Sequence, residues 1–284
     1  MSTTAHAIKV GARRGWTEFK LSLRAPDDLA FYLLWGGGLL VFLFLNRHEQ
    51  VEGTSLSLAA LVLPGAMAAM VVFGSVVGPA FQLVIEREDG TLLRAKAAPH
   101  GLEGYVTGQV VLQGLGVLPM AIILLIPSAI FIDGLASRGA SSWFAGIGIL
   151  VAGTLAMLPL GFIIGSLARK PSHVTTWGIL PVMGMAAISG IFTSVTNLAG
   201  WLQGLAQVFP MYWLGHALRW AFLPADAAAL ELGGRWNLLG AFAVVGAWGV
   251  VGLLVTPRIL ARMARRESGS TVEARKAERM QRVA

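Results

Sequence analysis

Long apolar runs separated by short polar segments are the main pattern in this sequence. Such runs favour helices that cross a membrane, because a spanning helix needs roughly 20 mostly apolar residues. Six of them lie at residues 29–45, 58–85, 105–132, 143–168, 174–195 and 238–255. The pattern therefore predicts an all-α polytopic membrane protein with six transmembrane helices.

A further apolar run, residues 198–223, has two interpretations. It contains Pro210, which interrupts a helix, and the polar residues Gln203, Gln207, His216 and Arg219. The run is either a seventh crossing or a re-entrant helical hairpin before the last span. With six spans, 18 of the 22 Lys and Arg residues share the side of the N-terminus. Because positive residues gather on the cytoplasmic side, this distribution favours an outer hairpin and two cytoplasmic termini.

The composition agrees with a membrane protein and sets the domain boundaries. The mean hydropathy is +0.68, with 55% hydrophobic and 13% charged residues, which is typical of polytopic membrane proteins. There is no cysteine, so disulfides and thiolate metal sites are excluded. We divide the chain into a cytoplasmic tail with an interfacial helix (1–28), a six-helix transmembrane domain (29–256) and a basic cytoplasmic tail (257–284).

The segment before the first span predicts an amphipathic helix lying in the membrane interface. Its apolar residues recur at spacings of four, three and four, with basic residues between them: Ala12, Trp16, Phe19 and Leu23. This pattern is typical of helices that contact lipid along one face, and Trp16 and Phe19 are the expected anchors. Pro26 and the acidic pair Asp27 and Asp28 are expected to end this segment and start the first span. The basic C-terminal tail predicts a contact with lipid headgroups rather than nucleic-acid binding.

A charged segment, residues 86–94, separates two of the longest apolar runs. Charged side chains are excluded from hydrocarbon, so we expect a short connector at a membrane face. Gly90 permits a bend, and Leu92 and Leu93 are expected to face inward. The connector, extended to residue 100, is the predicted docking segment, and its candidate contact residues are Glu86, Arg87, Glu88, Gly90, Thr91, Leu92 and Arg94.

Two motifs resemble those of one transporter family. The order Glu-Arg-Glu, any residue, Gly-Thr-Leu, a basic residue and a small-small-Pro end at 97–99 resembles the cytoplasmic coupling motif of ABC type-2 exporter permeases. These are the transmembrane subunits of drug, antibiotic or polysaccharide exporters, of the daunorubicin-resistance type. The re-entrant segment of that family is matched by Trp201, Gln203, Pro210, Tyr212 and Arg219. The resemblance covers residues 10–256, although Ala95 and Lys96 replace residues that are more often apolar.

The resemblance implies a fold, a location and partners. The expected protein is a multi-pass permease of the bacterial plasma membrane that contacts lipid, a cytosolic ABC ATPase subunit and a second permease subunit, as a homodimer or a paired heterodimer. Arg219 is expected to reach the outer surface. No lysine precedes Ser or Thr, so the chain lacks a phosphate loop, and ATP with Mg²⁺ would bind the partner. We expect no cofactor, metal or catalytic residue, because no nucleophile elbow or complete metal-ligand spacing occurs.

The substrate expected from this sequence is a lipophilic or amphipathic compound, such as a drug, an antibiotic or a lipid. Gln109 and Gln113 lie one helical turn apart and either face the pathway or hydrogen-bond between helices. The glycine pairs 74–78, 104–108 and 161–165 permit close helix approach within one subunit or between two. The alternatives are export of a lipid-linked polysaccharide and gradient-driven transport. The second is disfavoured because the predicted spans contain no ionisable residue.

Overall fold

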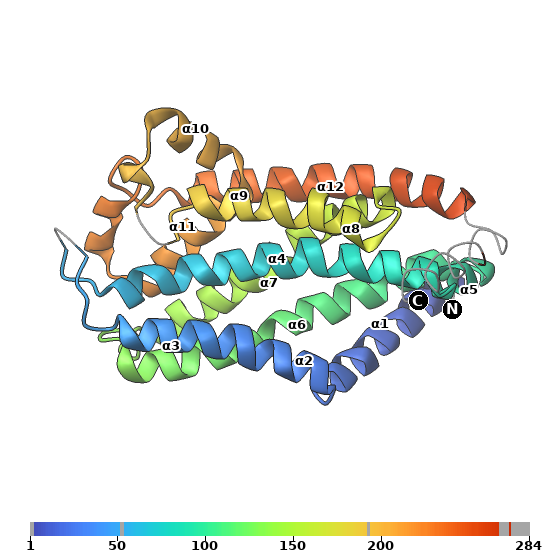
Figure 1. The fold of residues 1–284 in the computed structure, drawn as a ribbon, viewed down its shortest axis with the longest axis horizontal. Coiled ribbons are helices and arrows are strands. Elements are labelled where there is room, and N and C mark those ends of the chain that lie inside the picture. The colour runs from blue at the N-terminus through green and yellow to red at the C-terminus, as the bar shows by residue number, and fades with distance from the viewer. Residues whose placement is uncertain (1–2, 52–53, 192–193, 267–272, 274–284) are drawn as a thin grey trace.

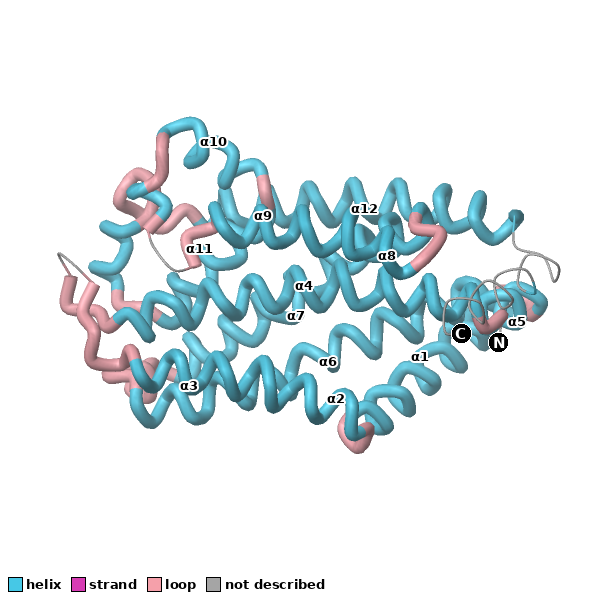
Figure 2. The backbone as a smooth tube through the Cα atoms, viewed as in Figure 1, coloured by secondary structure: helices cyan, strands magenta, loops and turns pink. Residues whose placement is uncertain are grey.

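The protein is an elongated bundle of helices that run side by side along its long axis (Figure 1). The computed structural model describes residues 3–51, 54–191, 194–266 and 273. Within these residues the chain is mostly helical and has no β-strand, and short loops connect the helices (Figure 2). The α-helices are α1 (Thr3–Ser22), α2 (Pro26–Phe31), α3 (Gly37–Leu45), α4 (Leu58–Glu88), α5 (Thr91–Ala97), α6 (Gly101–Phe131), α7 (Ala140–Leu167), α8 (Pro171–Val174), α9 (Leu180–Ile188), α10 (Gly200–Val208), α11 (Pro210–Phe222) and α12 (Leu238–Arg266). The shorter helical segments are η1 (Tyr32–Gly36), η2 (Thr175–Ile179), η3 (Val195–Asn197) and η4 (Ala225–Leu230).

Five helical segments in the described part of the chain are long and apolar enough to cross a membrane. They are Pro26–Leu45, Leu58–Glu88, Gly101–Phe131, Ala140–Leu167 and Leu238–Arg265. The all-α polytopic fold predicted from the sequence is confirmed. The remaining predicted span, 174–195, is helical from α8 through η2 to the end of α9, and it contacts α4 along its course. This segment is shorter and more polar than the other five, so six crossings remain a prediction.

Several helices are longer than the apolar runs that predict them. α4 continues to Glu88, one turn beyond the predicted end at residue 85, and α12 continues to Arg266 rather than ending near 255. A helix can continue beyond the end of an apolar run, because the backbone hydrogen bonds are the same in its apolar part and its polar part. The first residues of the predicted C-terminal tail are therefore part of α12. Residues 267–272 and 274–284 of that tail lie outside the described residues.

Helix α4 forms the centre of the bundle, and its close contact with α7 depends on glycine. A side chain at Gly161 would lie 2.7 Å from the backbone oxygen of Ser75, and one at Gly165 would lie 2.9 Å from the backbone of Ala80. Only a residue without Cβ permits this approach. Gly74 and Gly78 on α4 differ, because no atom lies within 4 Å of the position of a side chain there.

The N-terminal helix α1 packs against α6 through a second set of small residues. Its buried face consists of Ala7, Gly11, Gly15 and Phe19. A side chain at Gly11 would lie 2.1 Å from the carbonyl oxygen of Gly104, and one at Gly15 would lie 2.2 Å from that of Gly108. The pair Gly104 and Gly108 thus joins two helices of the same subunit.

The apolar residues of the predicted stripe on α1 lie in different surroundings within the protein. Trp16 is 49% exposed and Leu23 is 39% exposed, whereas Phe19 is buried. The packing face follows the glycines, because a close backbone contact needs small residues more than it needs large apolar ones. The rings of Trp16 and Phe19 lie 5.9 Å apart, so the two predicted anchors touch while facing different environments. The predicted boundary at Pro26 is confirmed, since α2 begins there with Asp27 and Asp28 in its first turn.

Candidate functional site

The charged segment that the sequence places outside the membrane begins inside the bundle. Glu86, Arg87 and Glu88 form the last turn of α4, and each is at most 8% exposed. The prediction that these side chains belong to a solvated connector is therefore wrong. The reason is tertiary: α1, α6 and α7 surround this end of α4, so its polar side chains are covered by protein rather than by water.

Glu86 joins α4 to the N-terminal helix α1. One oxygen of its carboxylate accepts from Arg14 at 3.2 Å and from Gln82 at 2.9 Å. Arg14 also donates to Glu18 at 2.6 Å. Burial lowers the pKa of Arg14, but the hydrogen bond and charge of Glu18 and the charge of Glu86 outweigh it and raise the pKa above its ordinary value. Glu86, which the sequence predicts to contact the ATPase subunit, thus joins α4 to α1 within its own chain.

Two cations connect this region to the ends of neighbouring helices. The guanidinium of Arg87 donates to the carbonyl oxygens of Ala168 and Gly165, at 2.8 and 3.2 Å, where α7 ends. The ammonium of Lys96, on α5, donates to the carbonyl of Ala264 at 2.6 Å, near the end of α12. The last carbonyls of a helix lack backbone partners and carry negative partial charge, so cations stabilise them. Lys96 thereby fastens the short helix α5 to α12, and Arg87 fastens the end of α4 to the end of α7.

The turn between α4 and α5 has the form predicted from the sequence. Gly90 has a φ of 79°, in the left-handed region, which a glycine adopts without strain. Asp89 accepts from the amide of Thr91 at 2.8 Å. Leu92 is buried in a small apolar cluster with Leu83, Tyr105, Leu158, Phe162, Leu260 and Met263, while Leu93 is only partly buried.

Fewer residues are exposed around the α4–α5 turn than the sequence predicts. Arg94 and residues 97–99 are exposed, and Thr91 is partly exposed. Arg94 donates to the hydroxyl of Thr91 at 2.9 Å. Of the seven candidate contact residues, Thr91 and Arg94 are accessible, and the other five are buried.

The opposite end of the bundle carries the hairpin of α10 and α11. The sequence predicts a break at Pro210, and the structure confirms it, because α10 ends at Val208 and α11 begins at Pro210. The indole N–H of Trp213 donates to the carbonyl of Gln207 at 2.7 Å, and that of Trp248 donates to the carbonyl of Val208 at 2.9 Å. These bonds satisfy carbonyls that the break leaves without helical partners.

The two helices of the hairpin have different surroundings. α11 is buried between α4, α7 and α12, whereas α10 exposes Trp201, which is 71% exposed. Gln203 donates to the carbonyls of Leu198 and Thr196, at 2.8 and 3.1 Å. Trp201 is thus available for contacts outside the subunit, and Gln203 fixes the loop before α10.

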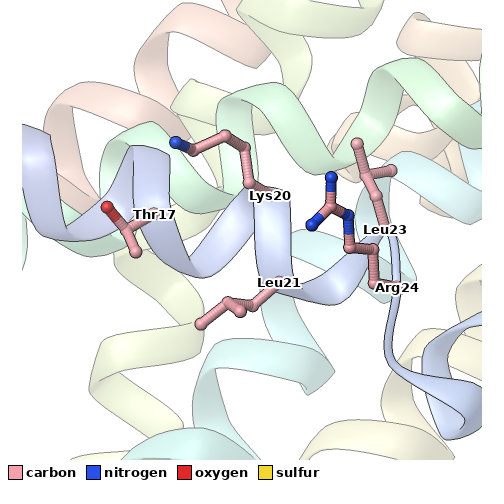
Figure 3. Close-up of a pocket in the computed structure, with 5 residues that line it drawn as sticks. All are labelled: Thr17, Lys20, Leu21, Leu23 and Arg24. Carbon is pink, nitrogen blue, oxygen red and sulfur yellow. The ribbon is translucent and has the colours of Figure 1, made fainter.

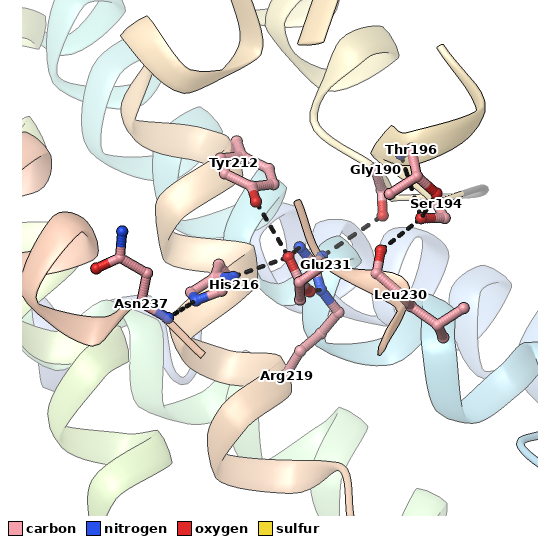
Figure 4. Close-up of polar contacts among 9 residues, drawn as sticks. All are labelled: Gly190, Ser194, Thr196, Tyr212, His216, Arg219, Leu230, Glu231 and Asn237. Carbon is pink, nitrogen blue, oxygen red and sulfur yellow. Dashed lines mark hydrogen bonds and ion pairs between the residues drawn. The ribbon is translucent and has the colours of Figure 1, made fainter. Parts of the chain in front are cut away.

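A buried polar network joins α11 to the loop before α12 (Figure 4). Glu231 accepts from Tyr212 at 3.2 Å, from His216 at 2.8 Å and from the guanidinium of Arg219. The other ring nitrogen of His216 accepts from the backbone N–H of Asn237 at 2.8 Å. Since that nitrogen accepts and the first one donates, His216 fits here as the neutral tautomer with its proton on Nδ1.

The electrostatics of Glu231 follow from this arrangement. Burial raises the pKa of its carboxyl, but the charge of Arg219 and the hydrogen bonds from His216 and Arg219 lower the pKa to about 2. The carboxylate is therefore ionised at neutral pH although it is only 3% exposed. A buried charge of this kind persists only when it is paired and fully hydrogen-bonded.

The expectation that Arg219 reaches the outer surface is wrong. The residue is 3% exposed and pairs with Glu231, because a counter-ion within the protein is available to it. Glu231 was missed by the sequence reasoning, since the loop 225–235 shows no periodicity. One signal was present: an arginine in an apolar helix requires an acid nearby, and that loop contains only Asp226 and Glu231. Of these two, Asp226 is exposed.

The two glutamines of α6 lie in different surroundings. Gln109 is 2% exposed, and its side-chain oxygen has no hydrogen-bond partner in the described chain. Gln113 is partly exposed. The two residues therefore do not form a shared polar surface within one subunit, and their predicted place along a pathway stays a prediction.

Comparison with known proteins identifies the family. A search of curated proteins gave no match. Residues 28–223, which are more than half of the chain, match the family described as ABC-2 type transporter. The matched region begins in the first span and ends with α11, so it contains both the α4–α5 turn and the hairpin. The chain is a multi-pass membrane protein and belongs to the ABC-2 type transporter family of permease subunits.

Proposed function

We propose that this chain is the permease subunit of an ATP-driven exporter and that a separate cytosolic ABC ATPase subunit docks on α5. The observation that carries the proposal is the anchoring of α5. Arg87 and Lys96 fasten the α4–α5 region to the ends of α7 and α12, and Leu92 holds α5 in an apolar cluster. A force applied to α5 would therefore reach α12 directly through Lys96, and α7 through the end of α4 and Arg87.

The exposed residues of α5 are the proposed docking surface. Thr91 and Arg94 lie at the inner end with no contact that buries them fully, and the exposed stretch 97–99 continues the same surface. ATP and Mg²⁺ would bind the ATPase subunit, because this sequence has no phosphate loop. Charged groups at the rim of an interface mainly affect how fast two partners associate and how they are oriented.

We further propose a bacterial plasma membrane location, two permease subunits for each pair of ATPases, and a lipophilic or amphipathic substrate that leaves the cell. The substrate class is supported by apolar, methionine and aromatic residues along the long helices. A drug, an antibiotic or a lipid would suit such surroundings, because binding sites for these molecules are mostly apolar with few polar groups.

The test uses the permease co-expressed with an ABC ATPase subunit encoded beside it. The double variant Thr91→Ala plus Arg94→Ala should retain folding, because neither side chain is buried, and should lose co-purification of the ATPase or substrate-stimulated ATP hydrolysis in liposomes. The matched control is Thr196→Ala plus Arg235→Ala, which removes the same groups from exposed positions at the outer end. Normal coupling in the first variant would refute docking on α5. Transport by the permease alone under a proton gradient would refute the ATP-driven function.

A further inference from the structure

A cleft of about 370 Å³ lies at the bend between α1 and the first span. It is lined by Thr17, Lys20, Leu21, Leu23 and Arg24 (Figure 3). Its residues combine two cations with two exposed leucines, since Leu21 is 62% and Leu23 is 39% exposed. We propose that this cleft binds the phosphate headgroup of an anionic phospholipid from the inner leaflet, with Lys20 and Arg24 as its ligands.

The two cations are available for a ligand. Within the described residues no carboxylate lies within ion-pair distance of Lys20 or Arg24, and the only contact of the Lys20 ammonium is with the ring of Trp16, at 5.8 Å. Figure 3 shows both cationic side chains on the side of the helix opposite to Leu21. Thr17 contributes no donor, because its hydroxyl donates to the carbonyl of Arg13 at 2.9 Å. The charge available to a phosphate therefore comes from Lys20 and Arg24.

The position of the cleft along the chain fits the level of lipid headgroups. Arg24 precedes by two residues the start of the first candidate span at Pro26. The side chains that follow in that span face outward, and Phe31, Leu33, Leu34 and Trp35 are 54–74% exposed. A lipid whose phosphate binds Lys20 and Arg24 would thus place its acyl chains beside Leu23 and these residues. Basic sites beside spanning helices on the cytoplasmic side attract anionic headgroups.

The neighbouring carboxylates do not form part of this cleft. Asp27 and Asp28 lie in the first turn of α2, after the residues of the cleft. Neither of them lines the cleft. The glycine contact between α1 and α6 holds the other side of α1, so the cationic side keeps a fixed orientation without a lipid.

The test is a lipid titration of the full-length protein in mild detergent, followed by native mass spectrometry. The probes are phosphatidylglycerol, phosphatidylcholine with the same acyl chains, and inorganic phosphate as a competitor. Wild-type protein should bind phosphatidylglycerol in preference to phosphatidylcholine. In the double variant Lys20→Gln plus Arg24→Gln the affinity for phosphatidylglycerol should fall by roughly 30-fold, since each cation contributes about fivefold at an anionic lipid surface.

A matched control removes the same charge from the same helix. Lys9→Gln plus Arg13→Gln changes two exposed residues of α1 that lie outside the cleft, and it should leave the affinity unchanged. An equal loss in both double variants would show general attraction to the helix and overturn the site. Equal binding of the two lipids would overturn it as well. Displacement of phosphatidylglycerol by millimolar inorganic phosphate would show a phosphate site without lipid selectivity, which contradicts the proposal.

The readout separates this proposal from the transport function. Lipid binding is measured without ATP, without an ATPase subunit and without a transported substrate. A negative titration would leave docking on α5 untouched, and failed docking would leave the lipid site untouched.

Discussion

Two buried carboxylates in this protein are held by specific partners rather than by solvent. Glu86 is paired with Arg14, and Glu231 with Arg219. Each carboxylate comes from a segment that looks polar and accessible in the sequence. In the fully buried pair of Arg219 with Glu231, removal of one partner leaves an uncompensated charge, which costs about 3–5 kcal/mol. Substitution of Glu231 should therefore act on folding before it acts on transport.

The residue-scale prediction concerns the acid sensitivity of Glu231. Its pKa is lowered from 4.5 to about 2 in the folded protein, so the folded state binds this proton more weakly than the unfolded chain. Its contribution to the free energy of unfolding is therefore complete above about pH 4.5 and is lost as the pH falls toward 2. Thermal unfolding in detergent, followed from pH 6 to pH 2.5, should show this loss in the wild type.

The variant Glu231→Gln should be less stable at pH 6 and should show a smaller change of stability across that pH range. Asp226→Asn, which alters an exposed acid of the same loop, should follow the wild type. If Glu231→Gln kept the full acid-induced loss, then another carboxyl group would be its source.

At the scale of elements, small residues and capping contacts decide how the helices meet. The α10–α11 break is stabilised by two indole groups that donate to free carbonyls. The α1–α6 contact depends on backbones that approach more closely than any side chain would permit. The bond from Trp248 and the α1–α6 contact both join segments far apart in the sequence.

The element-scale prediction is that Gly15→Val separates α1 from α6. A Cβ at residue 15 would lie 2.2 Å from the backbone oxygen of Gly108, and a backbone atom cannot move aside as a flexible side chain can. Forced overpacking of this kind typically costs about 1–3 kcal/mol. Limited digestion with trypsin should then cleave faster at Lys9 and Arg13, because α1 is no longer held against the bundle.

The control for this variant is Gly148→Val, since a side chain there meets no atom within 4 Å. It introduces the same residue into a helix and should leave the cleavage rate unchanged. Equal cleavage of wild type and Gly15→Val would show that the α1–α6 contact tolerates the added side chain.

At the scale of the whole molecule, the α4–α5 turn and the α10–α11 hairpin lie at opposite ends of the bundle. α5 lies at the same end as the start of α1 and the end of α12, and the hairpin α10–α11 lies at the opposite end (Figure 1). This arrangement agrees with the predicted topology in which the coupling segment is cytoplasmic and the hairpin is external. The segment from α8 to α9 decides this topology, because without its crossing only four spans would precede the hairpin, which would then lie on the side of the N-terminus.

The whole-molecule prediction uses the absence of cysteine from the chain. Single cysteines at His48 and Ala229 should react with a membrane-impermeant maleimide in intact cells. Single cysteines at Ala98 and Lys170 should react only after permeabilisation. All four positions are exposed, so access depends on the side of the membrane. Labelling of Lys170→Cys and Ala229→Cys from the same side would show that the α8–α9 segment does not cross.

The sequence by itself determined the features that depend on local chemistry. Apolar runs of sufficient length predicted the long helices, since the thickness of the bilayer sets that length. Pro210 predicted the break in the hairpin and Gly90 predicted the left-handed turn, because each residue restricts or frees its own backbone. The two motifs together predicted the family that the comparison confirmed.

The tertiary structure alone decided which residues meet. The burial of Glu86 and Glu88, the pairing of Arg219 with Glu231, the bond from Lys96 to the end of α12 and the packing face of α1 were wrong or absent in the sequence reasoning. Each depends on distances between segments that lie far apart in the chain or in a loop without periodicity. The local sequence around a charged residue or a glycine is the same whether that residue is exposed to water or lies in a contact between helices. Only its neighbours in the fold distinguish the two environments.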